Sequence, residues 1–389
     1  MVAQDLIAAS PEEVGIDRER LEALFARVRR DIEEGALPSA QVAIARHGKL
    51  AGFRTYGSAT QGGATRPATN DTLYTIFSAT KAIVAAAVWA LLEEGLLQLD
   101  ERVAAIVPEF GTNGKEIVTV EQVLLHTAGF PYAPLGPGKW ETRAGRLEAF
   151  ARWRLNWEPG SRFEYHASSA HWVLAEIIER RTGVESRTYV RQRIIAPMGL
   201  EDLYIGLPAE LNERVADVVH VAPPVPPPNG WGEVTPEAIL NFNRPEVRAV
   251  GNPGGGGIGR AAELALFYQV LINGGKTATG RQVLKPETIA FATRVRTTDQ
   301  HRDAIYNIPV NRGLSIVVAG DDGYKHLRGF GSLTSARAFG HGGAGGQIAW
   351  GDPVSGISLG YCTNGFADLE SLRQRTRDIC DLAARCAPA

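Results

Sequence analysis

Strand-like patterns lie near the two ends of the chain and helix-like patterns fill the middle, and this order limits the folds that the sequence can adopt. Residues 41–46 and 50–56 are two short runs around His47-Gly48-Lys49, which predict a hairpin with a three-residue loop that contains glycine. Further strands are predicted at residues 314–319 and 357–362. The pattern predicts an α/β unit built from both termini that carries an inserted all-helical part.

Helical patterns account for much of the remaining chain. Ser10 precedes Pro11 and two acidic residues, which predicts a helix that begins there and continues through Val28. A second pattern starts at Ser78 and ends at Gly95, with apolar residues repeating at three- and four-residue spacing. Further helices are expected at residues 120–126, 144–154, 167–181, 261–272 and 369–384.

The order of these elements also predicts the domain boundaries. We expect residues 1–80 and 250–389 to form a discontinuous α/β domain, and residues 81–249 to form a mainly helical domain. Residues 222–231 contain too many prolines for a regular helix or strand, so we expect them to form an extended surface connection or a lid.

Charge and composition argue against several classes of protein. The 41 Lys and Arg residues are balanced by 43 Asp and Glu residues, which leaves no excess of positive charge for nucleic acid or anionic lipid. The three cysteines form neither a CxxC pair nor an even framework that would require disulfides or zinc. The first residues lack a signal-peptide pattern and no apolar run reaches about 18 residues, so we expect a cytoplasmic protein without a membrane segment.

Ser78 and Lys81 form the most informative short motif. If a helix begins at Ser78, Lys81 lies on the same face one turn later, and its amine can reach the serine hydroxyl. Burial between apolar turns favours the neutral amine that can help to deprotonate the hydroxyl, and the helix N-terminus offers backbone N–H groups to an oxyanion. Taken alone, the motif also fits a helix cap followed by a solvated lysine.

Two later segments contain further polar candidates. Tyr165 stands just before the helix expected at 167–181, where the helix dipole and an adjacent lysine would favour a phenolate. His341 lies in the glycine-rich segment 339–346, whose backbone can approach a ligand closely. Taken alone, each also fits a structural role, Tyr165 as a half-buried loop anchor and the glycine-rich segment as a flexible hairpin.

Together these segments resemble the three ordered motifs of the class C β-lactamase superfamily of serine hydrolases, which includes DD-peptidases and family VIII carboxylesterases. Ser78-x-x-Lys81, Tyr165 after a Phe-Glu pair, and His341-Gly342-Gly343 correspond to those motifs in order. The resemblance covers most of the chain, because three more family segments have counterparts at residues 124–130, 197–200 and 254–259. It implies a β-lactamase/penicillin-binding-protein-like fold, with an antiparallel sheet flanked by helices, an inserted all-helical domain and the site between the two parts.

The resemblance also implies a role for each motif residue. Ser78 would be the nucleophile, Lys81 its activator, and Tyr165 the general base that later protonates the leaving alcohol. The backbone N–H groups of Ser78 and Ala344 would hold the oxyanion. His341 would stabilise the tyrosinate or position the substrate, and together with Gly342 and Gly343 it would form the surface that binds substrate. Neither a cofactor nor a metal ion is implied.

Two departures from the family pattern favour an ester as the substrate. The β-lactamases and DD-peptidases usually have Tyr-x-Asn, whereas Ala167 takes the place of that amide here. Their third motif is usually Lys-Thr-Gly, whereas His341-Gly342-Gly343 is closer to the esterase pattern. We therefore expect a carboxylesterase that cleaves small or medium esters through an acyl-serine, with Trp231 and Trp350 shaping its substrate site. A β-lactamase, a D-amino-acid peptidase or amidase, an acyltransferase and a non-catalytic binding homologue stay open, as does the oligomeric state.

Three other signals are weaker. Ser358 lies in a Gly-x-Ser-x-Gly pattern, but the residues after it continue as a strand where a nucleophile needs a turn and a helix. A dinucleotide fingerprint at residues 254–259 lacks a clear preceding strand and an acid about 20 residues later. The histidines show no close metal-ligand spacing, and we expect His126 to bond locally within its own turn.

Overall fold

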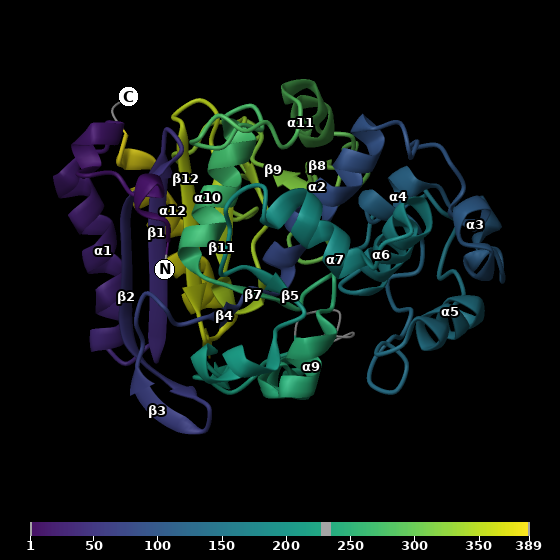
Figure 1. The fold of residues 1–389 in the computed structure, drawn as a ribbon, viewed down its shortest axis with the longest axis horizontal. Helices are drawn as coiled ribbons and strands as arrows, with labels where there is room; N and C mark the ends of the chain where they lie inside the picture. The colour runs from purple at the N-terminus through teal and green to yellow at the C-terminus, as the bar shows by residue number, and fades with distance from the viewer. Residues whose placement is uncertain (1, 227–234, 388–389) are drawn as a thin grey trace.

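The centre of the computed structural model, which describes residues 2–226 and 235–387, is an eight-stranded sheet. Every neighbouring pair in this sheet is antiparallel. Strands from the beginning and the end of the chain lie side by side, in the order β3-β2-β1-β12-β11-β10-β9-β8 (Figure 1). Their bounds are β1 Ser39–Arg46, β2 Lys49–Gln61, β3 Ala64–Pro67, β8 Arg312–Gly313, β9 Ile316–Val318, β10 Phe339–Gly340, β11 Ile348–Gly351 and β12 Ile357–Thr363. The predicted antiparallel sheet built from both ends of the chain is confirmed.

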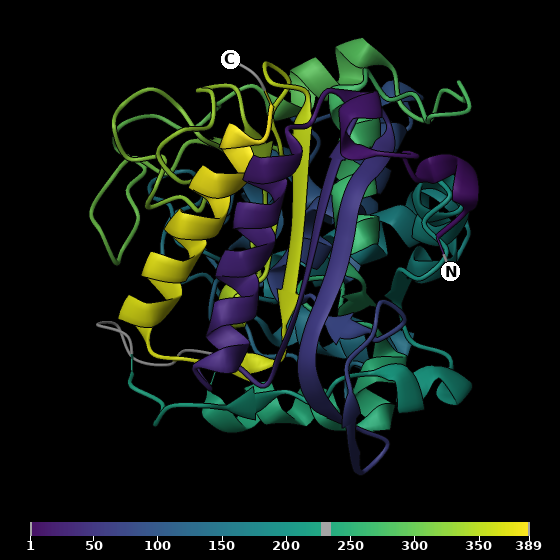
Figure 2. The same cartoon turned by 90° about the vertical axis from the view of Figure 1, so that its left-hand side faces the viewer.

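Helices cover both faces of this sheet. α1 (Arg18–Glu33) and α12 (Leu369–Arg385) lie side by side against one face (Figure 2). α10 (Ala261–Ile272) lies against the opposite face, in contact with β1, β11 and β12. Because side chains alternate along a strand, Val42 and Ile44 of β1 pack toward α1 and α12, whereas Ala43 packs toward α10. The sheet therefore separates two hydrophobic cores.

The middle of the chain folds into helices beside this α/β part (Figure 1). α6 (Ser169–Thr182) is central to them, because it contacts α2, α3, α4 and α7. The other helices are α3 Val103–Ile106, α4 Val120–Leu124, α5 Arg143–Arg152, α7 Ser186–Val190, α8 Pro236–Leu240, α9 Pro245–Val250 and α11 Pro286–Thr293. Among the helices of the described residues, none combines the length and the apolar character needed to cross a membrane.

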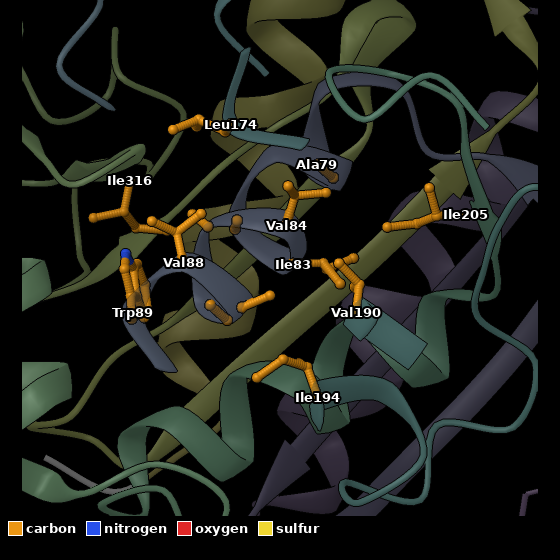
Figure 3. Close-up of a cluster of buried hydrophobic side chains, with 14 of the residues drawn as sticks. Ala79, Ile83, Val84, Val88, Trp89, Leu174, Val190, Ile194, Ile205 and Ile316 are labelled. Carbon is orange, nitrogen blue, oxygen red and sulfur yellow. The ribbon is translucent and has the colours of Figure 1, made fainter. Parts of the chain in front are cut away.

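Helix α2 (Thr80–Glu93) lies between the helical part and the sheet. Each of its residues from Thr80 to Leu91 is buried, as expected for a helix that is apolar on every side. Figure 3 shows Ile83, Val88 and Trp89 of this helix beside apolar side chains of other elements, including Val190 of α7 and Ile316 of β9. The boundaries predicted for two domains, at residues 80 and 250, stay a prediction.

Two short sheets join distant segments. β7 (Gly257–Gly259) lies between β4 (Tyr74–Thr75) and β5 (Tyr204–Ile205), with antiparallel pairing on both sides. β6 (Val219–His220) pairs in parallel with β13 (Gly365–Phe366). The first of these sheets places the glycine-rich residues before α10 directly beside the residues that precede Ser78.

The helix predicted from Ser10 to Val28 forms as two elements. A 3₁₀ turn over Pro11–Val14 comes first, and α1 follows after a break at Gly15, which has φ 68°. Asp17, not Ser10, caps α1, because its side chain accepts the Arg20 amide at 3.0 Å. The prediction of one helix is wrong, because its proline and acidic residues belong to the short first turn.

The hairpin between β1 and β2 turns more tightly than predicted. Arg46 pairs with Lys49, so the loop contains two residues, not three. His47 and Gly48 have φ values of 52° and 81°, which are the positive values that a two-residue turn of this kind requires. Glycine meets this requirement without strain, and histidine meets it at a cost.

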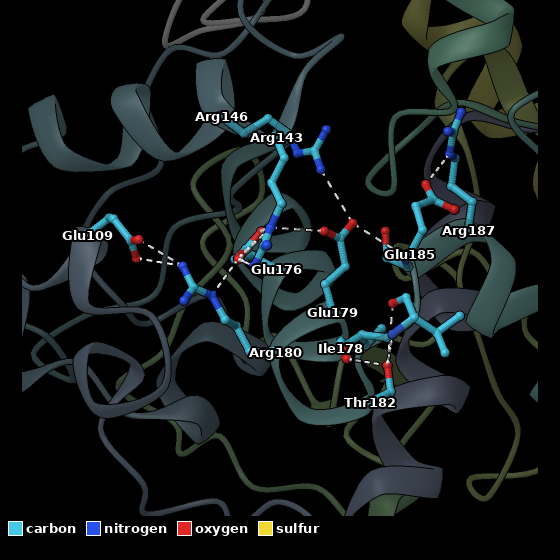
Figure 4. Close-up of polar contacts among 12 residues, drawn as sticks. Glu109, Arg143, Arg146, Glu176, Ile178, Glu179, Arg180, Thr182, Glu185 and Arg187 are labelled. Atoms are coloured by element: carbon cyan, nitrogen blue, oxygen red, sulfur yellow. Dashed lines mark hydrogen bonds and ion pairs between the residues drawn. The ribbon is translucent and has the colours of Figure 1, made fainter.

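Ion pairs surround one buried carboxylate on α6. The Glu176 side chain is 1% exposed, and it bonds to Arg143 at 2.5 Å and to Arg180 at 2.8 Å. Figure 4 shows this group beside Glu179, which pairs with Arg143 and Arg146. The side chains of Arg143 and Arg180 are 47% and 29% exposed, so the two cations keep part of their hydration.

We predict that Glu176→Ala lowers the free energy of unfolding by about 2 kcal/mol, because two charged hydrogen-bonded pairs are lost around a buried group. Glu148→Ala is the matched control, since Glu148 is 44% exposed and also pairs with two cations, Lys139 and Arg152. The loss in the control should stay below about 1 kcal/mol. Urea denaturation measures both values, and equal losses would contradict the importance of the buried pair.

Candidate active site

Ser78 lies in the tight turn that leads into α2. It belongs to a 3₁₀ turn over Phe77–Ala79 that continues directly as the helix. Phe77 has φ 45°, in the left-handed region that a bulky residue adopts only when its surroundings hold it there. The Thr80 hydroxyl holds this turn, because it donates to the Phe77 oxygen at 2.6 Å and accepts the Gly257 amide at 2.9 Å. The strained turn leaves Ser78 half-buried at the start of a buried helix.

The Lys81 amine faces the Ser78 hydroxyl. The Lys81 side chain is fully buried, and its Nζ lies 3.3 Å from Ser78 Oγ. The amine also donates to the Ala167 oxygen at 2.7 Å and to the Gly254 oxygen at 2.5 Å. With two N–H groups directed at carbonyl oxygens, a neutral amine can direct its lone pair at the hydroxyl. Gly254 enters the site through its backbone oxygen, a role that neither the family resemblance of residues 254–259 nor their nucleotide-like pattern predicted.

Tyr165 approaches the same amine from the segment before α6. Lys81 Nζ lies 4.9 Å from the centre of the Tyr165 ring. The Tyr165 hydroxyl is buried and forms no hydrogen bond within residues 2–226 and 235–387. The structure therefore brings Ser78, Lys81 and Tyr165 together and leaves the phenol oxygen available to a reacting group.

The glycine-rich segment lies beside the Ser78 turn. Gly343 packs so closely that an added Cβ would lie 2.3 Å from the backbone oxygen of Ile76. Ala344 begins a 3₁₀ turn that packs against Phe77. In the described part of the chain, neither the Ser78 amide nor the Ala344 amide donates a hydrogen bond. Two backbone N–H groups near Ser78 are thus available to an oxyanion.

His341 is buried, and its ring centre lies 6.0 Å from that of Tyr165. Arg312 donates to His341 Nε2 at 3.2 Å, and His341 Nδ1 lies 2.8 Å from the Gly342 oxygen. A guanidinium can only donate, so Nε2 must accept and Nδ1 must carry the proton. Burial and the positive charge of Arg312 hold the pKa of His341 well below its usual range. The ring is therefore neutral and has one fixed tautomer.

Arg312, the first residue of β8, is a site residue that the sequence analysis missed. Its guanidinium carbon lies 5.4 Å from the centre of the Tyr165 ring and 5.6 Å from that of Phe163. Burial holds the pKa of this guanidinium below its usual value, and the neighbouring Tyr165 and Asp303 offset part of that shift. No short motif surrounds Arg312 in the sequence, so only its neighbours in space reveal it.

Three further histidines pack behind Tyr165: His126, His166 and His171. The ring centres of His126 and Tyr165 are 4.8 Å apart, and His126 Nδ1 accepts the His166 amide at 3.2 Å. The prediction that His126 bonds within its own turn is therefore wrong, because its partner lies 40 residues away in the sequence. Burial lowers the pKa of all three rings, so they are neutral. Within the described residues, neither these histidines nor any other three His, Cys, Asp or Glu side chains are arranged to hold a metal ion.

Trp350 does not line the site, so this part of the substrate-site prediction is wrong. It is 1% exposed, and its Nε1 donates to Cys380 Sγ of α12 at 3.3 Å. Successive residues of β11 face opposite layers, which directs Trp350 toward α12 and Ala349 toward α10. Trp231, the other tryptophan predicted to shape the site, lies outside the described residues, as does the end of the proline-rich segment, residues 227–231.

Comparisons with known proteins agree with this fold. The Beta-lactamase family model matches residues 24–384. The esterase EstB of Burkholderia gladioli is 32% identical over 304 residues, which cover 71% of this chain and 73% of that protein. A putative D-alanyl-D-alanine carboxypeptidase of Escherichia coli (strain K12) is 26% identical over 392 residues, which cover 92% of this chain and 85% of that protein.

Solved structures show the same similarity over nearly the whole chain. A penicillin-binding protein homologue from Caulobacter crescentus superposes with a TM-score of 0.81 and 28% identity, covering 95% of this chain and 99% of that one. A family VIII carboxylesterase superposes with a TM-score of 0.78 and 26% identity, covering 96% and 99% of the two chains. The chain therefore belongs to the Beta-lactamase family of serine hydrolases and has its fold. The resemblance seen in the sequence is confirmed.

The close contact of Gly343 with Ile76 predicts that Gly343→Ala displaces the Ala344 turn from Ser78, because a Cβ would lie 2.3 Å from a backbone oxygen. We expect covalent labelling of Ser78 by a serine-directed phosphonate to slow by about 10- to 100-fold. Intact-mass measurements over time give the rate. Gly136→Ala is the control, since no heavy atom lies within 4 Å of its added Cβ. Wild-type labelling in Gly343→Ala would contradict the proposed place of Ala344 in the site.

Proposed function

We propose that the protein is a carboxylesterase that cleaves small or medium carboxylic esters through an acyl-serine intermediate. The observation that carries this proposal is the 3.3 Å contact between Lys81 Nζ and Ser78 Oγ, beside the buried Tyr165 hydroxyl. A serine hydroxyl is a weak nucleophile until neighbouring groups remove its proton. Lys81 and Tyr165 supply such groups on one side of Ser78.

In the proposed acylation, Ser78 Oγ attacks the ester carbonyl carbon while Lys81 activates the hydroxyl and the Tyr165 phenolate receives its proton. The amides of Ser78 and Ala344 stabilise the negative oxygen of the tetrahedral intermediate, an interaction typically worth about 3 kcal/mol per donor. Tyr165 then gives the proton to the leaving alcohol. The acyl group stays on Ser78, and Tyr165 is a phenolate again.

Deacylation uses the same groups in reverse. The Tyr165 phenolate takes a proton from water, and the resulting hydroxide attacks the acyl carbonyl. The bond to Ser78 Oγ breaks as the carboxylic acid forms, and Tyr165 returns the proton to Ser78. The two amides serve both intermediates, because the oxyanion develops at the same carbonyl oxygen each time.

The side chains around Ser78 support an ester as the substrate. Position 167 contributes its backbone oxygen to Lys81, and its alanine brings no amide to the site. The nearby Asn252 does not replace that amide, because its Oδ1 accepts the Gly254 amide at 2.8 Å and its Nδ2 donates to Ser168 Oγ at 3.2 Å. An esterase and a family VIII carboxylesterase are among the similar proteins. The cytoplasmic location and the absence of nucleic-acid and membrane partners stay predictions.

We predict that Ser78→Ala abolishes hydrolysis of a short p-nitrophenyl ester while the midpoint of thermal unfolding barely changes, because the half-buried hydroxyl contributes little to packing. The matched control is Ser358→Ala, which removes the serine of the Gly-x-Ser-x-Gly pattern. Ser358 is buried in β12, and its hydroxyl donates to the Ala265 oxygen at 2.7 Å, as expected of an ordinary strand serine. This control should lose stability and keep its turnover, and activity that survives in Ser78→Ala would place the nucleophile elsewhere.

A comparison of substrates tests the choice of an ester. We predict that kcat/KM for a short p-nitrophenyl ester exceeds that for a chromogenic cephalosporin or a D-alanyl-D-alanine peptide by at least about tenfold, because the site lacks the amide that would hold a lactam or a peptide. The reverse order would identify a β-lactamase or a peptidase. Acyl transfer that outruns hydrolysis when an alcohol is added would identify an acyltransferase. A folded protein whose Ser78 resists a phosphonate would be a binding protein.

A further inference from the structure

Arg312 lies in the site, but no step of the proposed reaction uses it. Its guanidinium carbon lies 5.4 Å from the centre of the Tyr165 ring, and its Nη1 donates to His341 Nε2 at 3.2 Å. It also lies 5.6 Å from the centre of the Phe163 ring. Two aromatic rings and one imidazole therefore surround the cation, directly against the base of the proposed reaction.

We propose that Arg312 is a positioning residue that supplies the positive charge beside the Tyr165 phenolate and fixes His341 as a neutral ring. A cation over an aromatic ring favours the anionic form of that ring when the group can ionise. This inference rests on the proposed function, because it requires Tyr165 to act as the base.

His341 cannot supply that charge itself. Its Nε2 lone pair is occupied by Arg312, and its Nδ1 proton is directed at the Gly342 oxygen. A neutral ring in this tautomer carries no net charge toward Tyr165. The related β-lactamases usually have a lysine at the position that corresponds to His341. In this chain Arg312 supplies the positive charge that such a lysine would carry, and it does so from β8, a different strand of the same sheet.

The groups that face Tyr165 come from four segments: Lys81 of α2, His126 after α4, Arg312 of β8 and His341 after β10. Burial keeps both histidines neutral. Within residues 2–226 and 235–387, no carboxylate lies within ion-pair distance of Arg312, although the negative charge of Asp303 acts on its guanidinium and raises its pKa. Lys81 is neutral when its lone pair faces the Ser78 hydroxyl, whereas an arginine does not lose its proton in proteins. Arg312 is therefore a permanent cation beside the phenol.

The test is the pH profile of kcat/KM for a short p-nitrophenyl ester in Arg312→Gln and Arg312→Lys. In the wild type, the rate rises with pH as the base loses its proton. Removing the cation disfavours the phenolate, so in Arg312→Gln this rise moves to higher pH by about one to two pH units, and the rate near neutral pH falls about 10- to 100-fold. Arg312→Lys keeps the charge, so its rise stays close to the wild-type pH even where a weaker hold on His341 lowers the rate.

Arg294→Gln is the matched control, because Arg294 also lies over an aromatic ring, 5.7 Å from the centre of Phe291, but its side chain is exposed and faces Phe291 instead of Tyr165. Its profile should equal that of the wild type. If kcat/KM of folded Arg312→Gln rises at the same pH as that of the wild type, the inference is overturned. The same holds if both Arg312 variants lose rate equally and neither shows a displaced pH profile. If Arg312→Gln does not fold, a displaced rise in Arg312→Lys overturns it. A wild type that neither turns over esters nor labels at Ser78 defeats the proposed function instead.

Discussion

The contact of the buried Lys81 amine with three oxygen atoms is the interaction on which the rest of the site depends. One oxygen belongs to Ser78 at the start of α2, one to Ala167 before α6, and one to Gly254 before β7. An amine taken out of water is costly unless such partners replace its hydration. The helical part, α2 and the backbone at Gly254 must therefore all be in place before the amine can lie beside the hydroxyl. The chemistry of the site and the packing of the fold cannot be separated at this point.

The sequence revealed those features that depend on near neighbours. Lys81 follows Ser78 by one helical turn, and the apolar pattern of α2 extends beyond it, so the pair could be recognised together with the helix that buries it. The strand patterns at both ends predicted a sheet shared by the two termini, which β1 and β12 form. The order of the three motifs along the sequence was sufficient to identify the family. Each single motif and each strand pattern lies within about one element of the chain.

Other features depend on contacts between distant residues, and these were missed or misplaced. Gly254 acts through its backbone oxygen, and because every residue has one, the residue type gives no signal of this role. Arg312 and His126 gain their roles from Tyr165, which comes from another part of the chain. Trp350 was assigned to the wrong place, because a tryptophan in a strand can face either layer and the sequence does not fix which one. The difference between the helix predicted from Ser10 and the observed α1 has a local cause, since two overlapping cap signals, Ser10 and Asp17, competed for one helix start.

The pairing of β1 with β12 also determines when the central sheet can form during synthesis of the chain. Ala43 of β1 lies opposite Gly360 of β12, so a ribosome releases one edge of the central pair long before it makes the other. Contacts between residues so far apart slow the search for the native state, and an unpaired strand edge in the nascent chain is a site for misassembly until its partner arrives. Prematurely terminated chains lack that partner, even where they already contain the serine, the lysine and the tyrosine. The central pair of strands therefore forms only after β12 has been synthesised.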